Sequence, residues 1–496
     1  MQSSLSSILM LRLAADKRIT SAGELPDPEP VCPGPVARLD NVAEYHVENF
    51  GCRASRSDGE AIAATLRLRG LEPAANMAGA DVFILNTCSV TEEADRSARA
   101  FLRRIRRENP AARVVVTGCY AQRSAAEVAA LAGVDAVVGN SHKAFVAETA
   151  LGLLSNADMA GFVPLQRLTA AIQVDESFAH SELAALPFAA DARQTRPNLK
   201  AQDGCDNRCS FCIIPTTRGP GRSVGLEQCV EDTRRFVKAG GRELVLSGIN
   251  LGRWGRDLQP PHRFEDLVAA LLEQCGLPRL RLSSVEPMDW TAGLLELFRE
   301  YAAGEHPRLA RHAHLPLQSG SDAILRRMHR RYRPWHYAER LAQIREIMPQ
   351  AAIGADVMVG FPGETDELFA ESYRFIEAQP FTYLHLFPFS ARPGTLAWEL
   401  HREKPVPAMA VKERMAALRG LMERKSLTFR KGFAGQRLSA VTLQPDEGRD
   451  GTPALTDNFL KVMLDDEMAA NALIHVEVTA VTEAGLRGVA EAVPVS

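Results

Sequence analysis

The chain has few cysteines, no long apolar run and little net charge, and each of these shortages excludes a class of protein. Nine cysteines among 496 residues are too few for the disulfide framework of a small secreted domain. No apolar run reaches the roughly 18 residues that a membrane-spanning helix needs. A net charge of −3 excludes a protein that is basic overall, although a local basic face remains compatible with it. The length and the 46% of hydrophobic residues predict a globular protein of two to four domains.

Residues 41–153 alternate short apolar runs with longer helical stretches, which predicts a parallel sheet with helices on its faces. Cys52, Cys88 and Cys119 each follow a predicted strand, in the segments NFGC, LNTC and VTGC. Because the carboxyl ends of parallel strands share one edge of a sheet, we expect these three thiols to converge there. The alternative is three unrelated buried cysteines, since cysteine is often buried.

The rest of the chain divides into four further parts. We expect residues 1–40 to be a disordered leader, with a transit peptide as the alternative, and residues 154–190 to be a linker. Six strand–helix units in residues 191–432 predict a partial (β/α)6 barrel, whose active face lies at the carboxyl ends of its strands. Short strands in residues 433–496 predict a small closed β-barrel. The expected fold class is therefore α/β with a small all-β domain at the end.

Three more cysteines lie in the segment GCDNRCSFC, namely Cys205, Cys209 and Cys212. A zinc ribbon would need a second CxxC pair, which the sequence lacks, although structural zinc remains the alternative. Three thiolates in one loop can hold three irons of a [4Fe–4S] cluster and leave the fourth iron without a protein ligand. Such an open iron can chelate S-adenosylmethionine through its amine and carboxylate, and reductive cleavage then yields an adenosyl radical.

With these motifs the chain resembles the radical SAM superfamily and, more closely, its methylthiotransferases. The resemblance spans residues 43–493 and rests on GCRASRSDGE, NTCSVTEEA, TGCYAQR, GCDNRCSFCIIPTTRGPGRS, ELVLSGINLGRWG, HLPLQSGSDAILRRMHRRY and DVMVGFPGET. It implies that Cys52, Cys88 and Cys119 hold a second [4Fe–4S] cluster, and that the third domain is similar to the RNA-binding TRAM domain. It also implies a cytoplasmic enzyme that uses S-adenosylmethionine, a sulfur donor and a flavodoxin- or ferredoxin-like electron donor, without a membrane.

Further residues are candidates for binding the cofactor. Gly240, Gly241 and Glu243 precede and open the second barrel strand, where the superfamily binds the methionine amine; the alternative is an ordinary helix end. The other candidates adjoin a cluster cysteine, follow a strand or lie within one, and they are Phe211, Asn250, Ser284, Glu286, Gln318 and Asp356. At the strand ends the alternative is a loop hydrogen bond, and for Asp356 it is a buried ion pair.

Two arginine-rich segments, residues 96–113 and 326–333, are candidates for contacts with RNA phosphates, with solvated helix faces as the alternative. The third domain has ten acidic against four basic residues from 433 to 496, which disfavours phosphate binding by the whole barrel. Residues 401–431 carry nine basic against three acidic residues. We therefore expect the RNA contact on this helix or on one strand face, where Lys461 is the best candidate.

The methylthiotransferases differ in their acceptor. The segment YLHLFPFSARPGTLA most resembles those that modify C2 of N6-threonylcarbamoyladenosine at tRNA position 37, next to the anticodon. Isopentenyladenosine at the same position and an aspartate of a ribosomal protein remain alternative acceptors. A different class, an RNA-binding protein whose clusters are structural, also remains open, although the presence of all six cysteines speaks against it.

Overall fold

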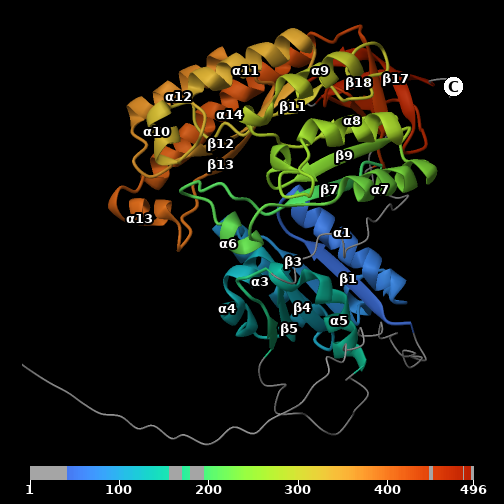
Figure 1. Ribbon diagram of the computed structural model, residues 1–496, viewed down its shortest axis with the longest axis vertical. Coiled ribbons are helices and arrows are strands. Elements are labelled where there is room, and N and C mark those ends of the chain that lie inside the picture. The colour runs from blue at the N-terminus through green and yellow to red at the C-terminus, as the bar shows by residue number, and fades with distance from the viewer. Residues whose placement is uncertain (1–41, 156–169, 179–194, 446–450, 484, 493–496) are drawn as a thin grey trace, which may run out of the picture. The chain divides into compact units, whose positions relative to one another are not determined.

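The structure is a computed structural model, and it describes residues 42–155, 170–178, 195–445, 451–483 and 485–492 (Figure 1). The expected leader and Cys32 lie outside the described residues. Val42–Ser496 form one unit, which contains two α/β parts and a closed barrel. None of the helices in the described part of the chain combines the length and the apolar character that crossing a membrane requires.

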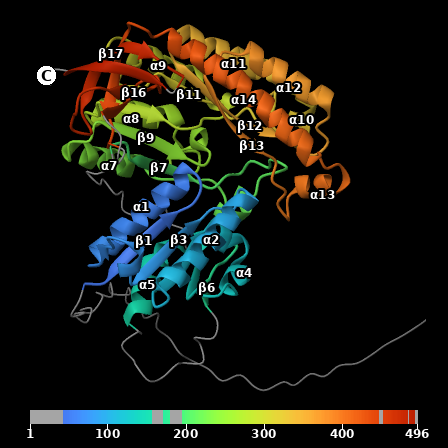
Figure 2. The same cartoon turned by 180° about the vertical axis from the view of Figure 1, so that it is seen from behind.

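The first part is a parallel sheet in the order β2-β1-β3-β4-β5-β6, of which Figure 2 labels β1, β3 and β6. Along β3, Phe83 and Leu85 pack against the α2 side, while Val82 and Ile84 pack against the α1 and α5 side. The strands are β1 (Glu44–Asn49), β2 (Glu72–Pro73), β3 (Val82–Thr87), β4 (Arg113–Gly118), β5 (Ala136–Gly139) and β6 (Ala171–Gln173). The helices are α1 (Arg53–Leu68), α2 (Glu92–Glu108), α3 (Cys119–Arg123), α4 (Ala125–Ala129), η2 (Asn140–Phe145) and α5 (Val146–Ser155). The predicted parallel sheet is confirmed.

The segment expected as a linker differs from the prediction, because β6 lies within residues 154–190 and adds the sixth strand to this sheet. Three residues are too few for an alternating pattern, so no periodicity marked this strand in the sequence. Residues 156–169 and 179–194 of the expected linker lie outside the described residues.

The second part contains the six expected strands in the order β7-β9-β10-β11-β12-β13, all parallel. Hydrogen bonding divides them into two sheets, which isolated bridges between Leu280 and Leu309 and between Ser284 and His314 connect. The strands are β7 (Asn198–Asp203), β9 (Glu243–Gly248), β10 (Arg279–Leu282), β11 (His312–His314), β12 (Ala352–Val359) and β13 (Tyr383–Pro388), with the short antiparallel β8 (Arg222–Ser223) beside β7. This open arc confirms the partial barrel.

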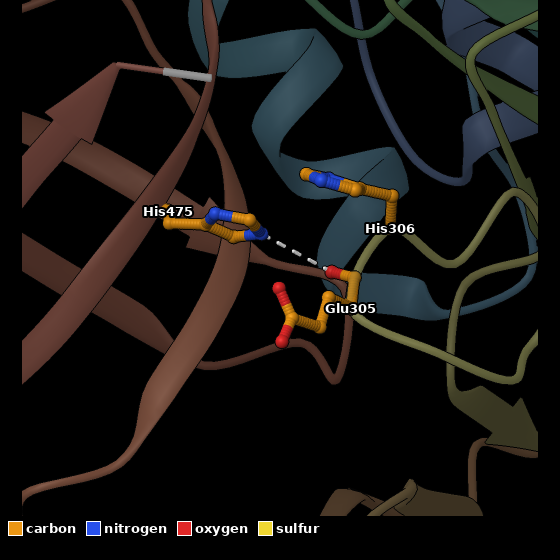
Figure 3. Close-up of side chains that lie close together, drawn as sticks. All are labelled: Glu305, His306 and His475. Atoms are coloured by element: carbon orange, nitrogen blue, oxygen red, sulfur yellow. Dashed lines mark hydrogen bonds between the residues drawn. The ribbon is translucent and has the colours of Figure 1, made fainter. Parts of the chain in front are cut away.

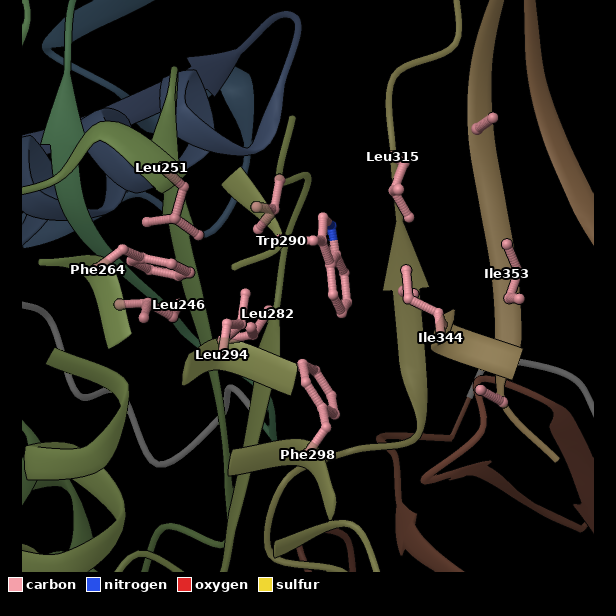
Figure 4. Close-up of a cluster of buried hydrophobic side chains, with 14 of the residues drawn as sticks. Leu246, Leu251, Phe264, Leu282, Trp290, Leu294, Phe298, Leu315, Ile344 and Ile353 are labelled. Carbon is pink, nitrogen blue, oxygen red and sulfur yellow. The ribbon is translucent and has the colours of Figure 1, made fainter. Parts of the chain in front are cut away.

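The core of this partial barrel lies between the strands and the helices that cover them (Figure 4). Trp290 and Phe298 are fully buried and their rings stack 5.2 Å apart, beside Leu282 of β10 and Leu315, which follows β11. The helices are α6 (Ile214–Arg218), α7 (Leu226–Lys238), α8 (Phe264–Gln274), α9 (Ala292–Tyr301), α10 (Asp322–Arg327), α11 (Pro334–Ile347), α12 (Asp366–Ala378), α13 (Leu396–Glu403) and α14 (Ala408–Lys431). The packed interior makes the strand ends a rigid platform for loops.

The third part is a closed barrel in the order β14-β15-β16-β18-β17. It adjoins the amino ends of the partial-barrel strands, because Arg281 of β10 donates to the backbone oxygens of Thr456 and Asp457 at 3.0 Å. The strands are β14 (Arg437–Thr442), β15 (Thr452–Thr456), β16 (Lys461–Leu464), β17 (Leu473–Val481) and β18 (Leu486–Ala492). The predicted closed barrel is confirmed, and β15 is a strand that the sequence analysis missed.

Candidate active site

A cavity of about 540 Å³ opens at the carboxyl ends of the partial-barrel strands. The loop after β1 contributes Cys52 to its wall, and the loop after β7 contributes Cys205, Cys209 and Cys212. The cysteines of the cavity wall thus come from loops that follow strands of two different sheets, and Cys88 and Cys119 lie behind the wall beside Cys52. We call Cys52, Cys88 and Cys119 the dispersed set, and Cys205, Cys209 and Cys212 the loop set.

Glycines allow the dispersed set to form. Gly51 has a φ of +102°, and a Cβ atom there would lie 2.5 Å from the Cβ of Cys88, so only glycine permits this approach. Gly118 has a φ of +94°, and a Cβ atom would lie 2.2 Å from the backbone oxygen of Thr87. Burial, reinforced by the neighbouring Cys119, raises the pKa of the Cys88 thiol to about 12. This thiol therefore stays protonated unless a bound cation stabilises its thiolate.

Hydrogen-bond donors surround the loop set. Cys205 Sγ accepts from the backbone N–H of Asn207 at 3.4 Å and from Asn250 Nδ2 at 3.5 Å. Cys209 Sγ accepts from Arg330 Nη1 at 3.2 Å. Burial raises the pKa of Cys212 to about 12. Donors aimed at sulfur are the second shell that stabilises a cluster-bound thiolate, so three sulfurs in this setting fit a [4Fe–4S] cluster.

The cavity also offers unpaired polar atoms to a small ligand. Within the described residues, Asn250 Oδ1 and Gln318 Oε1 are buried, line the cavity and have no hydrogen-bond partner. A buried polar atom without a partner is costly, and a ligand with N–H or O–H groups would satisfy both. The site therefore fits S-adenosylmethionine, which carries an amine, a ribose and an adenine.

A buried ion network joins the two α/β parts beside the cavity. Asp58 of α1 pairs with Lys143, Lys200 and Arg218, and Arg218 also pairs with Asp203 at 2.8 Å. The Asp58 side chain is fully buried. Burial alone would raise the pKa of Asp58, but the three cations lower it to about 2. Because Arg218 belongs to the segment that follows the loop set, this network fixes the two cysteine sets relative to each other.

The segment Ser390–Pro393, in the loop after β13, makes a second link between the two α/β parts. Arg392 is 3% exposed, and its Nη1 donates to Asp95 of α2 at 2.7 Å. Arg123 donates to the same Asp95 oxygen at 3.0 Å, and the backbone N–H of Glu92 donates to Ser390 at 3.1 Å. The loop after the last barrel strand thus holds the start of α2, which follows the Cys88 loop.

The structure brings six of the predicted cofactor-binding residues to the cavity. Its wall includes Phe211, Asn250, Ser284, Glu286, Gln318 and Asp356. Phe211 packs edge-on against Phe361 at 6.5 Å, and Glu286 pairs with Arg330, which in turn contacts Cys209. These residues come from the ends of different strands, as in other barrel enzymes.

Asp356 belongs to a polar group with two histidines. Ser284 Oγ and His314 Nδ1 lie 2.7 Å apart, and His385 Nδ1 donates to Asp356 Oδ1 at 3.2 Å. Burial lowers the pKa of His314 to about 4, so this ring is neutral at pH 7 and its 3.6 Å contact with Asp356 is not an ion pair. Burial would raise the pKa of Asp356, but the hydrogen bond from His385 holds it below its usual value.

The structure does not bring Gly240, Gly241 and Glu243 to the cavity. They lie at the amino end of β9, whereas the cavity lies at the carboxyl ends. Gly241 packs on the ring of Phe236, where a Cβ atom would lie 2.2 Å from the ring. Glu243 is fully buried and pairs with Arg281 at 2.7 Å and with Arg196 at 2.8 Å. The expectation that these three residues bind the methionine amine is wrong, because the sequence analysis chose the opposite end of the strand.

Other residues of the cavity wall were missed. They include residues 247–249 at the carboxyl end of β9, together with Arg53, Arg330, Tyr383 and His385. The rule that polar or small residues follow strand ends would have found Ser247 and Gly248. Arg330 was expected to contact RNA phosphates, but it is 7% exposed and holds Glu286 and Cys209 instead.

Most of the other arginines in the two basic segments also have partners. Arg106 donates to the backbone oxygen of Ala112 at 2.7 Å and pairs with Asp135. Arg104 pairs with Glu108, and Arg326 pairs with Asp322. Such local pairs reduce the charge that is available to a phosphate, so the prediction of an RNA-binding face on α2 stays a prediction.

A group of potential metal ligands outside the cavity wall contains Glu305, His306 and His475 (Figure 3). The two imidazole rings stack 4.4 Å apart with 26° between their planes. Stacked rings direct their nitrogen lone pairs side by side rather than toward one ion. His475 also contacts the backbone oxygen of Glu305 at 3.3 Å, which links β17 to the loop before β11. We assign this group a structural role.

Two families match separate parts of the chain. Residues 44–139 match a family described as Uncharacterized protein family UPF0004, and residues 199–376 match the Radical SAM superfamily. The chain has the same fold as the radical S-adenosylmethionine methyltransferase TsrM from Kitasatospora setae, with a TM-score of 0.55 and 14% identity. That likeness covers 73% of this chain and 77% of TsrM, and at this identity it shows the fold alone.

Curated relatives match nearly the whole chain. Threonylcarbamoyladenosine tRNA methylthiotransferase MtaB of Bacillus subtilis is 34% identical and covers 85% of this chain, which in turn covers 90% of the relative. The protein of the same name in Aquifex aeolicus is 35% identical, with coverages of 86% and 98%. The tRNA-2-methylthio-N(6)-dimethylallyladenosine synthase of Sphingopyxis alaskensis is 32% identical, with coverages of 84% and 89%. The Radical SAM match implies S-adenosylmethionine and [4Fe–4S] clusters as cofactors, and two sets of three cysteines agree with two clusters. The chain therefore belongs to the radical SAM methylthiotransferase family.

Proposed function

We propose that this enzyme adds a methylthio group to C2 of N6-threonylcarbamoyladenosine at position 37 of tRNA. The observation that carries the proposal is the cavity to which both cysteine sets contribute. Inserting sulfur at an unactivated carbon requires a radical at that carbon and a sulfur atom within reach, and one cavity between two cluster sites supplies both. When bound, the two clusters and S-adenosylmethionine supply the radical, the sulfur carrier and the methyl group.

We assign the loop set to the cluster that cleaves S-adenosylmethionine and the dispersed set to the auxiliary cluster. The protein's own contribution is to bind and orient. Asn250 and Gln318 offer unpaired oxygens to the nucleoside or to the cofactor, and Glu286 orients Arg330 against Cys209. The aromatic and apolar remainder of the wall, which includes Phe211, excludes water from the reacting atoms.

The acceptor assignment is supported by the names of the relatives from Bacillus subtilis and Aquifex aeolicus, which specify threonylcarbamoyladenosine. The relative from Sphingopyxis alaskensis acts by its name on the dimethylallyl nucleoside, so this acceptor is the second candidate. For the RNA contact we retain Lys461, which is exposed on β16, and the exposed cations of α14, namely Lys412, Arg419, Arg424 and Lys431. A sulfur donor and a flavodoxin- or ferredoxin-like electron donor complete the proposed reaction in the cytoplasm.

Mass spectrometry of tRNA nucleosides tests the proposal. The chain and a Cys205→Ala variant are expressed in cells that lack their own methylthiotransferases. We expect 2-methylthio-N6-threonylcarbamoyladenosine with the unaltered chain and none with the variant. Formation of the methylthio dimethylallyl nucleoside instead would retain the reaction and overturn the acceptor. Formation of neither product by an enzyme with both clusters assembled would overturn the proposal.

A further inference from the structure

Arg53 is a cation in the active-site cavity without a partner. It is the first residue of α1, directly after Cys52, and its side chain lines the cavity and is open to solvent. Within the part of the chain that the structure describes, its guanidinium makes no hydrogen bond and no ion pair. The other arginine of the cavity wall, Arg330, has such contacts, because it binds Glu286 and Cys209. A guanidinium has five N–H donors, and in a confined site they need acceptors.

The position of Arg53 brings no local benefit to its helix. α1 has no acidic residue in its first turn and no side-chain cap at Cys52. The amino end of a helix carries a partial positive charge, so a cation at the first position is unfavourable there. This cost would be offset by an anion in the cavity.

Arg53 shares the cavity wall with residues of the barrel strands. Tyr383 and His385 of β13 and His312 of β11 line the same cavity. Arg53 therefore presents its guanidinium to the cavity that the Cys52 loop and the barrel strands share.

The carboxylates of the cavity wall already have partners. Glu286 pairs with Arg330, and Asp356 accepts a hydrogen bond from His385. Among the described residues that line the cavity, Arg53 therefore has no anionic partner, which favours an anionic group on the ligand.

We propose that Arg53 binds the carboxylate of the threonyl group of the acceptor nucleoside and thereby selects this acceptor over one with an apolar group on N6. The inference rests on the proposed function, in which the acceptor enters between the two cysteine sets. A carboxylate matches the planar fork of a guanidinium, and a dimethylallyl group offers no acceptor to it. The carboxylate of S-adenosylmethionine is the other source of the same chemistry, but it belongs beside the loop set, whereas Arg53 adjoins the dispersed set.

Binding measurements on the cluster-loaded enzyme test this inference. The probes are two anticodon stem-loop RNAs, one with N6-threonylcarbamoyladenosine at position 37 and one with its methyl ester, which lacks the negative charge. We expect the enzyme to bind the free acid roughly 10- to 100-fold more tightly than the ester. Arg53→Gln should abolish this preference, and Arg53→Lys should retain part of it. Arg56→Gln is the matched control, because Arg56 is an exposed arginine of the same helix outside the cavity wall.

Four results would overturn the inference. Arg53→Gln could keep the full preference for the acid. It could also weaken the binding of both RNAs equally, as the loss of a phosphate contact would. The unaltered enzyme could fail to distinguish the acid from the ester. Arg53→Gln could raise the KM for S-adenosylmethionine in the formation of 5′-deoxyadenosine without RNA, which would assign Arg53 to the cofactor. An enzyme that prefers the acid but does not methylthiolate it would overturn the proposed function while leaving carboxylate recognition by Arg53 in place.

Discussion

The two cysteine sets reach one cavity by different structural routes. The loop set comes from eight consecutive residues after β7, so its geometry is local. The dispersed set is collected from the ends of β1, β3 and β4, so its geometry depends on strand order, on register and on two glycines. The position of one set relative to the other depends in turn on a buried ion network. The three sulfurs of one cluster site thus come from a single loop, whereas those of the other require the whole first domain.

Breaking the ion network should have the largest effect on stability. The variant Asp58→Asn removes a buried carboxylate that Lys143, Lys200 and Arg218 share. Leaving buried charges without their partner costs about 3–5 kcal/mol, so we expect a loss of this size in the free energy of unfolding. Urea denaturation of the variant measures it. A loss below about 1 kcal/mol would show that the network does not hold the two parts together.

The same network predicts how stability depends on pH. The folded-state pKa of Asp58 is about 2, below its unfolded value, so its contribution is complete above the unfolded pKa. As the pH falls from about 4 toward 2, this contribution should disappear. The free energy of unfolding, measured by denaturation at several pH values in this range, should therefore change less steeply with pH for Asp58→Asn than for the unaltered enzyme. Equal slopes would contradict the depressed pKa.

Gly118→Ala should disturb the dispersed set alone. The added methyl group would lie 2.2 Å from the backbone oxygen of Thr87, and the φ of +94° is strained for alanine. We expect a loss of a few kcal/mol in stability and about half of the iron content, with 5′-deoxyadenosine still formed. Iron analysis and product assays measure both. Loss of 5′-deoxyadenosine formation in the folded variant would show that the loop set is not independent.

Asn250→Ala should have a moderate effect at the loop set. It removes the hydrogen bond to Cys205 and a buried oxygen that faces the cavity. Losing a hydrogen bond to a charged group predicts a rise of roughly tenfold in the KM for S-adenosylmethionine. The rate of 5′-deoxyadenosine formation against cofactor concentration measures it. An unchanged KM would remove Asn250 from the binding site.

Gly240→Ala should have the smallest effect and sharpens the contrast between the two ends of β9. Its neighbourhood is open, but its φ is +86°, so we expect a loss of about 1 kcal/mol in stability. The KM for S-adenosylmethionine should not change, because Gly240 lies away from the cavity. A raised KM would restore the original assignment of this residue to cofactor binding.

The predictions made from the sequence differ in the same way, according to whether they depend on local or on long-range geometry. Strand–helix alternation predicted both sheets, and the strand-end rule predicted that Cys52, Cys88 and Cys119 converge at one edge of the first sheet and that the active face of the barrel lies at its carboxyl ends. The Gly240–Gly241 pair was assigned wrongly because a motif near a strand does not tell which end of the strand it serves. Arg330 was misjudged because its partner Glu286 is distant in sequence. The fold could be read from periodicity, whereas pairing across the barrel could not.

The most direct test of the central claim, that the two cysteine sets do separate work in one cavity, compares Cys88→Ala with Cys205→Ala. Each variant is reconstituted with iron and sulfide and supplied with S-adenosylmethionine, reductant and tRNA. We predict that Cys88→Ala still forms 5′-deoxyadenosine but no methylthio nucleoside, and that Cys205→Ala forms neither. Methylthio product from Cys88→Ala, or loss of 5′-deoxyadenosine in both variants despite an intact loop-set cluster, would contradict the division of work.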